Sequence, residues 1–387
     1  MERPTPLYLD NGATSYPKPD AVYDSMVSYM RGNGASPGRG NYARAMEADR
    51  LVYETRKAIA ELLGVPRPGQ VIFTCNATES INMALKGYLR QGDRVLTTGY
   101  EHNAVMRPLK KLEARRQVQV ERIPCTAEGA LDMTAAKAKL REGVRLLAVS
   151  HASNVIGCVT PLDEAVAAAH ECGAAVLVDA AQTAGVCPID VTAVPVDMLA
   201  FTGHKGLLGP TGTGGLYLRK GFELSTLKEG GTGGMSLSPF PPDDPPDRYE
   251  AGTMNISGIA GLHASVRYLL DIGVDAVRAH EAELTGLLLD GFESIPRLTY
   301  YGPRSAGRIG LVSFNIEGHD PHKVSMRLDR DYGIMVRSGL HCAPEAHRLL
   351  GTAPTGAVRA SVGYFNQPSD IARLVGALGE IASRPPD

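Results

Sequence analysis

The sequence predicts an α/β fold in which a largely parallel β-sheet is covered by helices on both faces. Apolar runs of strand length alternate along the chain with amphipathic stretches of helix length. The strand-like runs are apolar throughout, which is typical of parallel strands that are buried on both faces. At 387 residues the chain exceeds the usual size of a single hydrophobic core. We therefore expect a large domain over residues 16–260 and a smaller α/β domain formed by residues 1–15 and 261–387.

The large domain is expected to follow a regular order of strands and helices. Residues 44–63 predict a helix, because Met46, Val52 and Ile59 fall on one side and Gly64 is a stop signal. Strands are then expected at residues 71–74, 95–97, 146–149, 175–178, 198–201 and 215–218. The helices that lie between them are expected at residues 78–89, 109–116, 133–141 and 162–172.

Residues 229–246 are rich in Gly and Pro, and they predict a long loop or arm. Loops of this length inside compact proteins are often functional, and a plain solvent-exposed linker is the alternative. Beyond this loop, we expect one or two long helices over residues 256–290, strands at 311–316 and 334–337, and a terminal helix at 369–382.

Composition and charge argue against several classes of protein. A net charge of −2, with no long run of Lys or Arg, does not fit nucleic acid or an anionic membrane as the main partner. No apolar run reaches the roughly 18 residues of a membrane span, and the N-terminus lacks a secretory signal pattern. The six cysteines contain no CxxC pair, which favours a reduced, cytoplasmic protein. No cluster of His and Cys has the spacing of a metal site.

Two of the strand-like runs lead into a carboxylate and a lysine. The run at residues 175–178 stops at Asp179, and the run at residues 198–201 is followed by Lys205. This pair is suited to pyridoxal 5'-phosphate (PLP), because a carboxylate pairs with the pyridine nitrogen and a lysine amine forms a Schiff base with the aldehyde. The alternatives are that Asp179 caps the next helix and that Lys205 is a surface lysine. We predict that both residues bind PLP.

Other polar residues near the predicted strand ends suit the rest of this cofactor. Ala77 and Thr78 open a helix directly after a strand, so their backbone amides and the Thr hydroxyl can bind a phosphate. An ordinary helix cap is the alternative. Thr202 and His204 would add two donors from the other side, and Gln182 is placed to reach the phenolic oxygen of the ring.

Two further residues are candidates for contact with the cofactor ring. His102 comes just past another predicted strand end, and it would stack on the ring and move protons. The alternative for His102 is that it only caps or packs. Asn154 would contact a ring substituent or the substrate.

The C-terminal part presents a candidate nucleophile. Residues 336–344 predict a strand that runs into a glycine-containing loop with Cys342. His341 precedes this cysteine and Arg337 lies nearby, and positive neighbours favour the thiolate form of a cysteine. A buried structural cysteine is the alternative, but Gly, Pro and polar residues surround this one.

Arg359 is a lone cation between apolar neighbours on a predicted strand. Such a residue needs a partner, and a substrate α-carboxylate bound through two hydrogen bonds is a good candidate. Arg337 and Asn154 are further candidates for substrate binding. An ion pair between Arg359 and an internal Asp or Glu is the alternative.

With these residues assembled, the chain resembles the class V aminotransferase group of PLP enzymes, and within it the cysteine desulfurases. The resemblance runs over nearly the full length and lies in an ordered set of motifs. These occupy residues 8–14, 76–82, 101–103, 153–157, 179–182, 202–205, 250–253, 337–343 and 358–361. Any one motif is a weak signal, whereas the ordered set is highly specific.

The resemblance implies a PLP-dependent transferase of the type I fold, with a mainly parallel seven-stranded sheet. It also implies a homodimer with active sites at the subunit boundary. Lys205 would hold PLP, His102 would stack on it, and Arg359 would clamp the substrate carboxylate. Thr253 would reach the phosphate of the partner chain's cofactor.

The separation of 17 residues between Cys342 and Arg359 is similar to that of the short-loop subgroup, which also includes selenocysteine lyases. Leu340 stands where that subgroup often has a second His. The implied activity releases L-alanine from L-cysteine and leaves the sulfur on Cys342 as a persulfide. A protein acceptor would then take the sulfur, for example a scaffold for iron–sulfur cluster assembly. The alternatives are a selenocysteine lyase or another class V enzyme, and a non-catalytic PLP-fold protein that serves as a sulfur-carrier scaffold.

Overall fold

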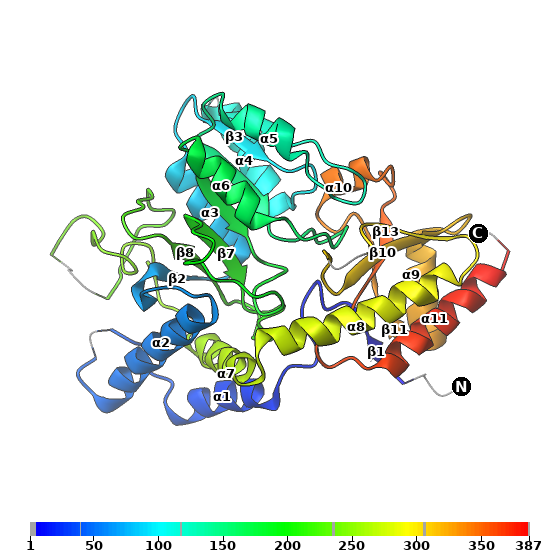
Figure 1. The fold of residues 1–387 in the computed structure, drawn as a ribbon. Coiled ribbons are helices and arrows are strands. Elements are labelled where there is room, and N and C mark those ends of the chain that lie inside the picture. The colour runs from blue at the N-terminus through cyan, green and yellow to red at the C-terminus, as the bar shows by residue number, and fades with distance from the viewer. Residues whose placement is uncertain (1–4, 39, 117, 234–236, 305–306, 386–387) are drawn as a thin grey trace.

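The computed structural model describes residues 5–385, apart from residues 39, 117, 234–236 and 305–306. Two large sheets, one of seven strands and one of four, dominate the described chain. Helices pack on each of them, and the two sheets lie in different halves of the molecule (Figure 1).

The seven-stranded sheet has the order β2-β8-β7-β6-β5-β3-β4. Its strands are β2 (Val71–Thr74), β3 (Arg94–Thr97), β4 (Gln119–Arg122), β5 (Leu146–Ser150), β6 (Ala175–Asp179), β7 (Met198–Thr202) and β8 (Gly214–Leu218). β8 runs antiparallel to both of its neighbours, and every other adjacent pair is parallel. Strands β5 to β8 are buried along their whole length, which explains their apolar sequences. The predicted α/β fold with a mainly parallel seven-stranded sheet is confirmed.

Helices cover both faces of this sheet, as predicted. One face packs against α3 (Ala77–Tyr88) and α4 (Asn103–Arg116). The other face packs against α2 (Ala43–Leu62), α5 (Met133–Leu140), α6 (Leu162–Glu171) and α7 (Ile256–Ile272). Among the described helices, none is long and apolar enough to cross a membrane.

Three elements differ from the sequence prediction. The helix expected at residues 109–116 begins earlier, at Asn103, because α4 accommodates Pro108 in its interior. Strand β4 was not predicted, since it is an edge strand in which three of the four residues are polar and none is fully buried. Helix α1 (Asp20–Gly32) was also not predicted, because Val22 is its only fully buried residue and its apolar pattern is weak.

The C-terminal part is built on a four-stranded sheet with the order β12-β13-β10-β9, in which all neighbours are antiparallel. Its strands are β9 (Leu298–Tyr300), β10 (Leu311–Ile316), β12 (Arg337–Gly339) and β13 (Ala357–Ser361). Its helices are α8 (Val274–Glu293), α9 (Pro321–Tyr332), α10 (Pro344–Leu349) and α11 (Pro368–Ser383). Near the N-terminus, β1 (Leu7–Tyr8) pairs in parallel with β11 (Ile334–Met335), so this segment joins the C-terminal part. The strand predicted at residues 334–337 is divided into β11 and β12.

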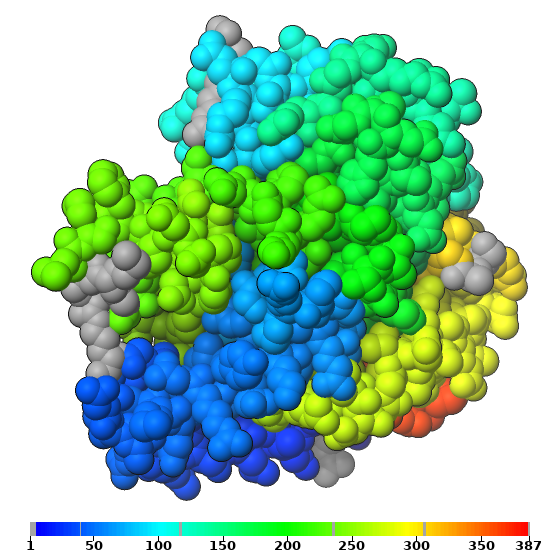
Figure 2. Space-filling view, turned by 60° about the vertical axis from the view of Figure 1, so that its left-hand side comes forward, coloured from blue at the N-terminus to red at the C-terminus, as the bar shows by residue number. Residues whose placement is uncertain are grey.

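The described residues of the loop at 229–246 form neither helix nor strand, as predicted, and they project from the side that carries α1 and α2 (Figures 1 and 2). Leu237 and Phe240 of this loop are strongly exposed. The C-terminal end of the loop is anchored by a buried ion pair between Arg56 on α2 and Glu250, with two N···O distances of 2.6 and 2.8 Å. The loop lies far from α10 of the same chain (Figure 1).

Candidate active site

The carboxyl ends of the parallel strands create the candidate site. β5, β6 and β7 end at Ser150, Asp179 and Thr202, and parallel strands bring such ends to one edge of the sheet. A cavity of about 480 Å³ lies at this edge. It is lined by nine of the ten residues predicted to bind the cofactor: Ala77, Thr78, His102, Asn154, Asp179, Gln182, Thr202, His204 and Lys205.

Asp179 and Lys205 both line this cavity, and each influences the charge of the other. Asp179 is buried, and its Oδ1 accepts a hydrogen bond of 2.9 Å from the backbone N–H of Ala181. Burial raises the pKa of Asp179, while that hydrogen bond and the charge of Lys205 act in the opposite direction. Burial lowers the pKa of Lys205 to about 8, and Asp179 opposes this shift. Lys205 is therefore not a surface lysine, and about a tenth of its amine is neutral near pH 7.

The start of α3 provides the donors that the sequence predicted. The side chain of Asn76 caps this helix by accepting a hydrogen bond of 3.0 Å from the N–H of Glu79. Within the described chain, the N–H groups of Ala77 and Thr78 have no acceptor, because they belong to the first turn. Amide donors at one end of the cavity, and an acid with an amine elsewhere on its wall, fit a phosphate-bearing pyridine aldehyde such as PLP.

The turn around Lys205 is covered by the N-terminal segment. The carbonyl of His204 accepts hydrogen bonds from the N–H of Ser15, at 2.9 Å, and from the hydroxyl of Thr14, at 3.0 Å. Nδ1 of His204 is buried and has no partner among the described residues. Gln182 donates from Nε2 to the carbonyl of Gly12 at 3.0 Å. These contacts bring the N-terminal segment and the middle of the chain together at one side of the cavity.

His102 lines the cavity and is neutral near pH 7. Its Nδ1 accepts a hydrogen bond of 3.0 Å from the N–H of Ala104, so the neutral ring carries its proton on Nε2. Burial, followed by the charge of Lys205, lowers its pKa to about 4. The capping contact given as the alternative is therefore present, and it is combined with a place in the cavity wall.

Sequence reasoning missed Glu101, which is fully buried next to His102. Its carboxylate accepts hydrogen bonds from the hydroxyl of Thr98, at 2.7 Å, and from the N–H and hydroxyl of Ser150, at 2.9 and 2.6 Å. Burial raises the pKa of Glu101 to about 7. Glu101 thereby joins the ends of β3 and β5 beneath the site. A carboxylate four residues after a predicted strand end was the available signal.

Cys342 lies beside the cavity and is exposed, so the alternative of a buried cysteine is wrong. It lines an adjoining opening of about 720 Å³ together with Thr78 and His102, which also line the cofactor cavity. The loop is held in an unusual conformation, since His341 and Cys342 have φ angles of 49° and 56°. The N–H of Asn103 donates to the carbonyl of Cys342 at 2.7 Å, and Nδ2 of Asn154 donates to the carbonyl of His341 at 2.7 Å.

A chain of hydrogen bonds that was not predicted lies behind Cys342. Nδ1 of His341 is 3.3 Å from Nε2 of His347, and Nδ1 of His347 is 2.8 Å from the hydroxyl of Thr352. Burial lowers the pKa of His341 to about 2, so this histidine stays neutral and does not supply the positive charge that was expected beside Cys342.

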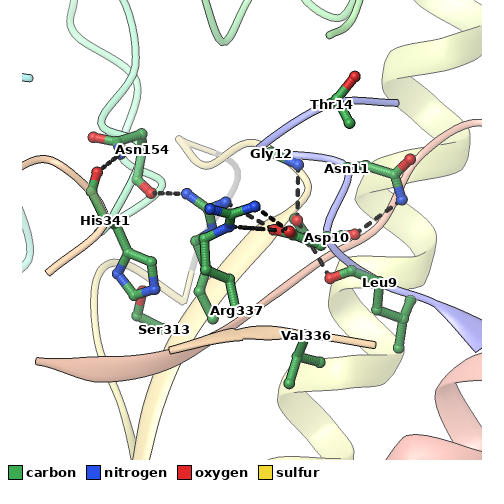
Figure 3. Close-up of polar contacts among 12 residues, drawn as sticks. Leu9, Asp10, Asn11, Gly12, Thr14, Asn154, Ser313, Val336, Arg337 and His341 are labelled. Carbon is green, nitrogen blue, oxygen red and sulfur yellow. Dashed lines mark hydrogen bonds and ion pairs between the residues drawn. The ribbon is translucent and has the colours of Figure 1, made fainter. Parts of the chain in front are cut away.

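The two predicted arginines share one carboxylate, that of Asp10 (Figure 3). Nη2 of Arg359 is 3.1 Å from Oδ1 of Asp10, and Nη2 of Arg337 is 2.8 Å from Oδ2. Nη1 of Arg359 donates to the carbonyl of Asn154 at 3.0 Å. The internal ion pair given as the alternative for Arg359 is therefore present, and sequence reasoning had not identified Asp10. Two cations with one carboxylate leave an excess positive charge here.

Thr253 is the one predicted cofactor residue that lies outside the cavity. It is exposed and lines two other cavities, together with neighbours that include Gly252 and Met254. Its contact with the cofactor of a partner chain stays a prediction. Among the described residues, no group of three or more His, Cys, Asp or Glu could hold a metal ion.

Comparisons with known proteins agree over almost the whole chain. The family model described as aminotransferase class-V matches residues 7–374. A probable cysteine desulfurase of Pyrococcus abyssi is 36% identical over 384 residues, which cover 97% of this chain and 94% of that protein. The apo structure of a cysteine desulfurase from Thermococcus onnurineus NA1 has a TM-score of 0.91 and 35% identity, over 97% of this chain and 94% of that one. The cysteine desulfurase CsdA (S-sulfonic acid) from Escherichia coli has a TM-score of 0.87 and 30% identity, over 96% and 94%.

Proposed function

This chain belongs to the class-V aminotransferase family and, within it, to the cysteine desulfurases, and from this premise we propose how its residues perform the reaction. The enzyme converts L-cysteine to L-alanine, with PLP held in the cavity of about 480 Å³ and Cys342 as the residue that receives the sulfur. The observation that carries this assignment is the placement of Lys205 and Asp179 in one cavity, beside an opening that exposes Cys342.

Different residues of the cavity would bind different parts of the cofactor. Lys205 would bind the aldehyde through Nζ, and Asp179 would pair with the pyridine nitrogen and keep it protonated, since both residues line the cavity. The donors at the start of α3, together with Thr202 and His204, bind the phosphate. His102 would lie against the ring and Gln182 would reach the phenolic oxygen, since both side chains line the cavity. When bound, PLP supplies an electron sink for charge that develops at the substrate Cα.

In a homodimer, the partner subunit's Thr253 completes the phosphate site. The exposure of this residue, and the anchoring of its segment by the Arg56–Glu250 ion pair, support the assignment. We also propose the division into a large domain over residues 16–260 and a small domain over 1–15 and 261–387. The pairing of β1 with β11 supports it.

Substrate binding is assigned to Arg359 and Arg337, which share the carboxylate of Asp10. L-Cysteine presents a carboxylate, and the excess positive charge of Arg359 and Arg337 around Asp10 suits it. Nη1 of Arg359 is held by Asn154, so the guanidinium is fixed before substrate arrives.

Proton transfer is assigned to Lys205 and sulfur transfer to Cys342. The neutral amine of Lys205 would take the Cα proton of the bound substrate, which its lowered pKa permits near neutral pH. The Cys342 thiolate then attacks the substrate sulfur, so that an S–S bond forms as the C–S bond breaks. The electron pair of the C–S bond stays with the carbon skeleton, which takes up protons to become L-alanine. One cysteine and one thiol give one alanine and one persulfide, with no external oxidant.

A product assay tests this function directly. Purified enzyme loaded with PLP is incubated with L-cysteine, and L-alanine is measured together with the mass of the protein. We expect alanine release and a mass increase of one sulfur on the peptide that contains Cys342. Pyruvate or a keto acid in place of alanine would indicate another class V reaction, and no product at all would indicate a scaffold. Parallel reactions with L-selenocysteine determine which chalcogen is preferred.

The lowered pKa of Lys205 makes cofactor loading dependent on pH. Only the neutral amine attacks an aldehyde, so loading of the cofactor-free enzyme should rise about tenfold per pH unit below pH 8 and level off above it. Visible absorbance after mixing with PLP, followed between about pH 6 and pH 10, measures this rate. A rate that still rises steeply at about pH 10 would mean that Lys205 titrates like an ordinary exposed lysine.

A further inference from the structure

The opening beside Cys342 is lined by positively charged side chains that have no role in the proposed reaction. Arg107, Lys111 and Lys86 line this opening together with the exposed thiol. Its described lining contains no Asp or Glu. The chain as a whole has a net charge of −2, so this positive charge is a local concentration and not a property of the whole surface.

Two of these cations lie on one face of α4. Arg107 and Lys111 are four residues apart, which places them one helical turn from each other on the same side. Both are exposed, and over the part of the chain that is described neither forms an ion pair with an Asp or Glu. Their charges are therefore available to a partner in solution.

Two acidic residues that lie near this opening in sequence have cationic partners, and a third, Glu101 next to His102, is fully buried. Glu345, three residues after Cys342, pairs with Arg122 at 3.3 Å and with Arg348 at 2.6 Å. Glu79, next to Thr78, pairs with Lys228 at 2.7 Å. The opening consequently keeps its positive charge, and an approaching anion meets no unpaired carboxylate from these positions.

We propose that this opening binds an acidic segment of the protein that takes sulfur from Cys342, with carboxylates on both sides of the accepting thiol. This inference rests on the proposed persulfide function of Cys342. The cations extend along a helical turn of about 5 Å, so they fit several carboxylates spread along a chain better than the single carboxylate of a small thiol.

The transfer itself needs no further reagent. The acceptor thiolate attacks the terminal sulfur of the Cys342 persulfide, and a new S–S bond forms on the acceptor. The S–S bond to Cys342 breaks, and Cys342 leaves as a thiolate with the electron pair. The proton of the terminal sulfur moves with that sulfur, so atoms and electrons balance.

Three synthetic peptides test the proposal on the PLP-loaded enzyme. Each has one cysteine, flanked on both sides by Glu, by Gln or by Lys. Enzyme treated with L-cysteine donates its persulfide to each peptide, and mass spectrometry follows the transfer. In a second arm, labelled peptides with Ser in place of Cys bind to untreated enzyme, and fluorescence anisotropy measures their affinity. This arm does not depend on turnover.

We expect the Glu peptide to react and bind about tenfold better than the Gln peptide at low salt, and this preference should disappear at about 1 M salt. Lys111→Glu should lower or reverse the Glu-over-Gln ratio, and Lys111→Gln should lower it less. Lys111 is preferred to Arg107, because Arg107 also contributes to the pKa of His102. Lys110→Glu is the matched control, because Lys110 is on the same helix, pairs with Glu113 and does not line the opening.

Equal binding of the Glu and Gln peptides at low salt would overturn the proposal, even if the enzyme forms its persulfide normally. An equal effect of Lys110→Glu and Lys111→Glu would also overturn it. If the Glu peptide binds through Lys111 but no persulfide forms on Cys342, the docking surface stands and the proposed function fails.

Discussion

Replacement of Cys342 by Ala is expected to reduce alanine release from L-cysteine by at least about 1,000-fold. The physical reason is that the C–S bond breaks only when a thiolate takes the sulfur, and Cys342 is the exposed cysteine in the opening that adjoins the cofactor cavity. Cys75 is also exposed, but it lines a different cavity. Cys158 and Cys187 are buried, and burial raises the pKa of each thiol to about 11, so they cannot replace it.

The visible absorbance of the bound cofactor should be unchanged in Cys342→Ala, because Cys342 lines the adjoining opening and not the cofactor cavity itself. The matched control is Cys172→Ala. Cys172 lies between α6 and β6, at the edge of the sheet opposite Asp179, and its removal should leave alanine release within about twofold of the unaltered enzyme. Full alanine release by Cys342→Ala would remove this residue from the mechanism.

Replacement of Lys205 by Ala is expected to remove the visible absorbance band of the bound cofactor and at least about 1,000-fold of the activity. Among the described residues that line the cavity, Lys205 is the only lysine, so no other amine of that lining can bind the aldehyde or take the Cα proton. Lys205→Arg should lose the absorbance band and the activity to the same extent, because guanidinium keeps the positive charge but is neither a nucleophile nor a base near neutral pH.

Lys18→Ala is a demanding control for this result. Burial lowers the pKa of Lys18 to about 8, as it does for Lys205, but Lys18 donates to Ser15 and lies outside the cavity. If a lowered pKa were sufficient for a lysine to bind the cofactor, Lys18→Ala and Lys205→Ala would lose the absorbance band alike. We expect Lys18→Ala to keep the absorbance band, and thermal unfolding of all variants checks that they are folded. A band that persists in Lys205→Ala would show that the lysine assignment is wrong.

The main sheet and its functional edge could be predicted because they follow from local patterns. Strands that are apolar throughout and alternate with helices give a parallel sheet, and parallel strands bring their carboxyl ends to one edge. Asp179 and Lys205 therefore had to come close together once the strands were recognised. Elements with weak patterns were missed for the same reason, as with the partly exposed β4 and with α1, which has one buried residue.

The environment of the arginines could not be predicted in this way. Asp10 meets Arg359 across 349 positions of the chain, in a contact made where the N-terminal segment packs beside β13. The chain from His341 through His347 to Thr352 likewise depends on how the loop after Cys342 folds back on α10. Neither contact leaves a periodic signal in the sequence.

What the sequence determined by itself was the order of strands and helices and the chemistry at each strand end, because hydrophobic periodicity and residue type are local properties. Only the tertiary structure decided which charged side chains form ion pairs and which remain exposed to solvent. Asp10 was found to join Arg337 and Arg359, whereas Arg107 and Lys111 beside Cys342 are exposed to solvent. The reason is that an ion pair depends on distances of a few ångströms between distant segments, and packing alone sets those distances.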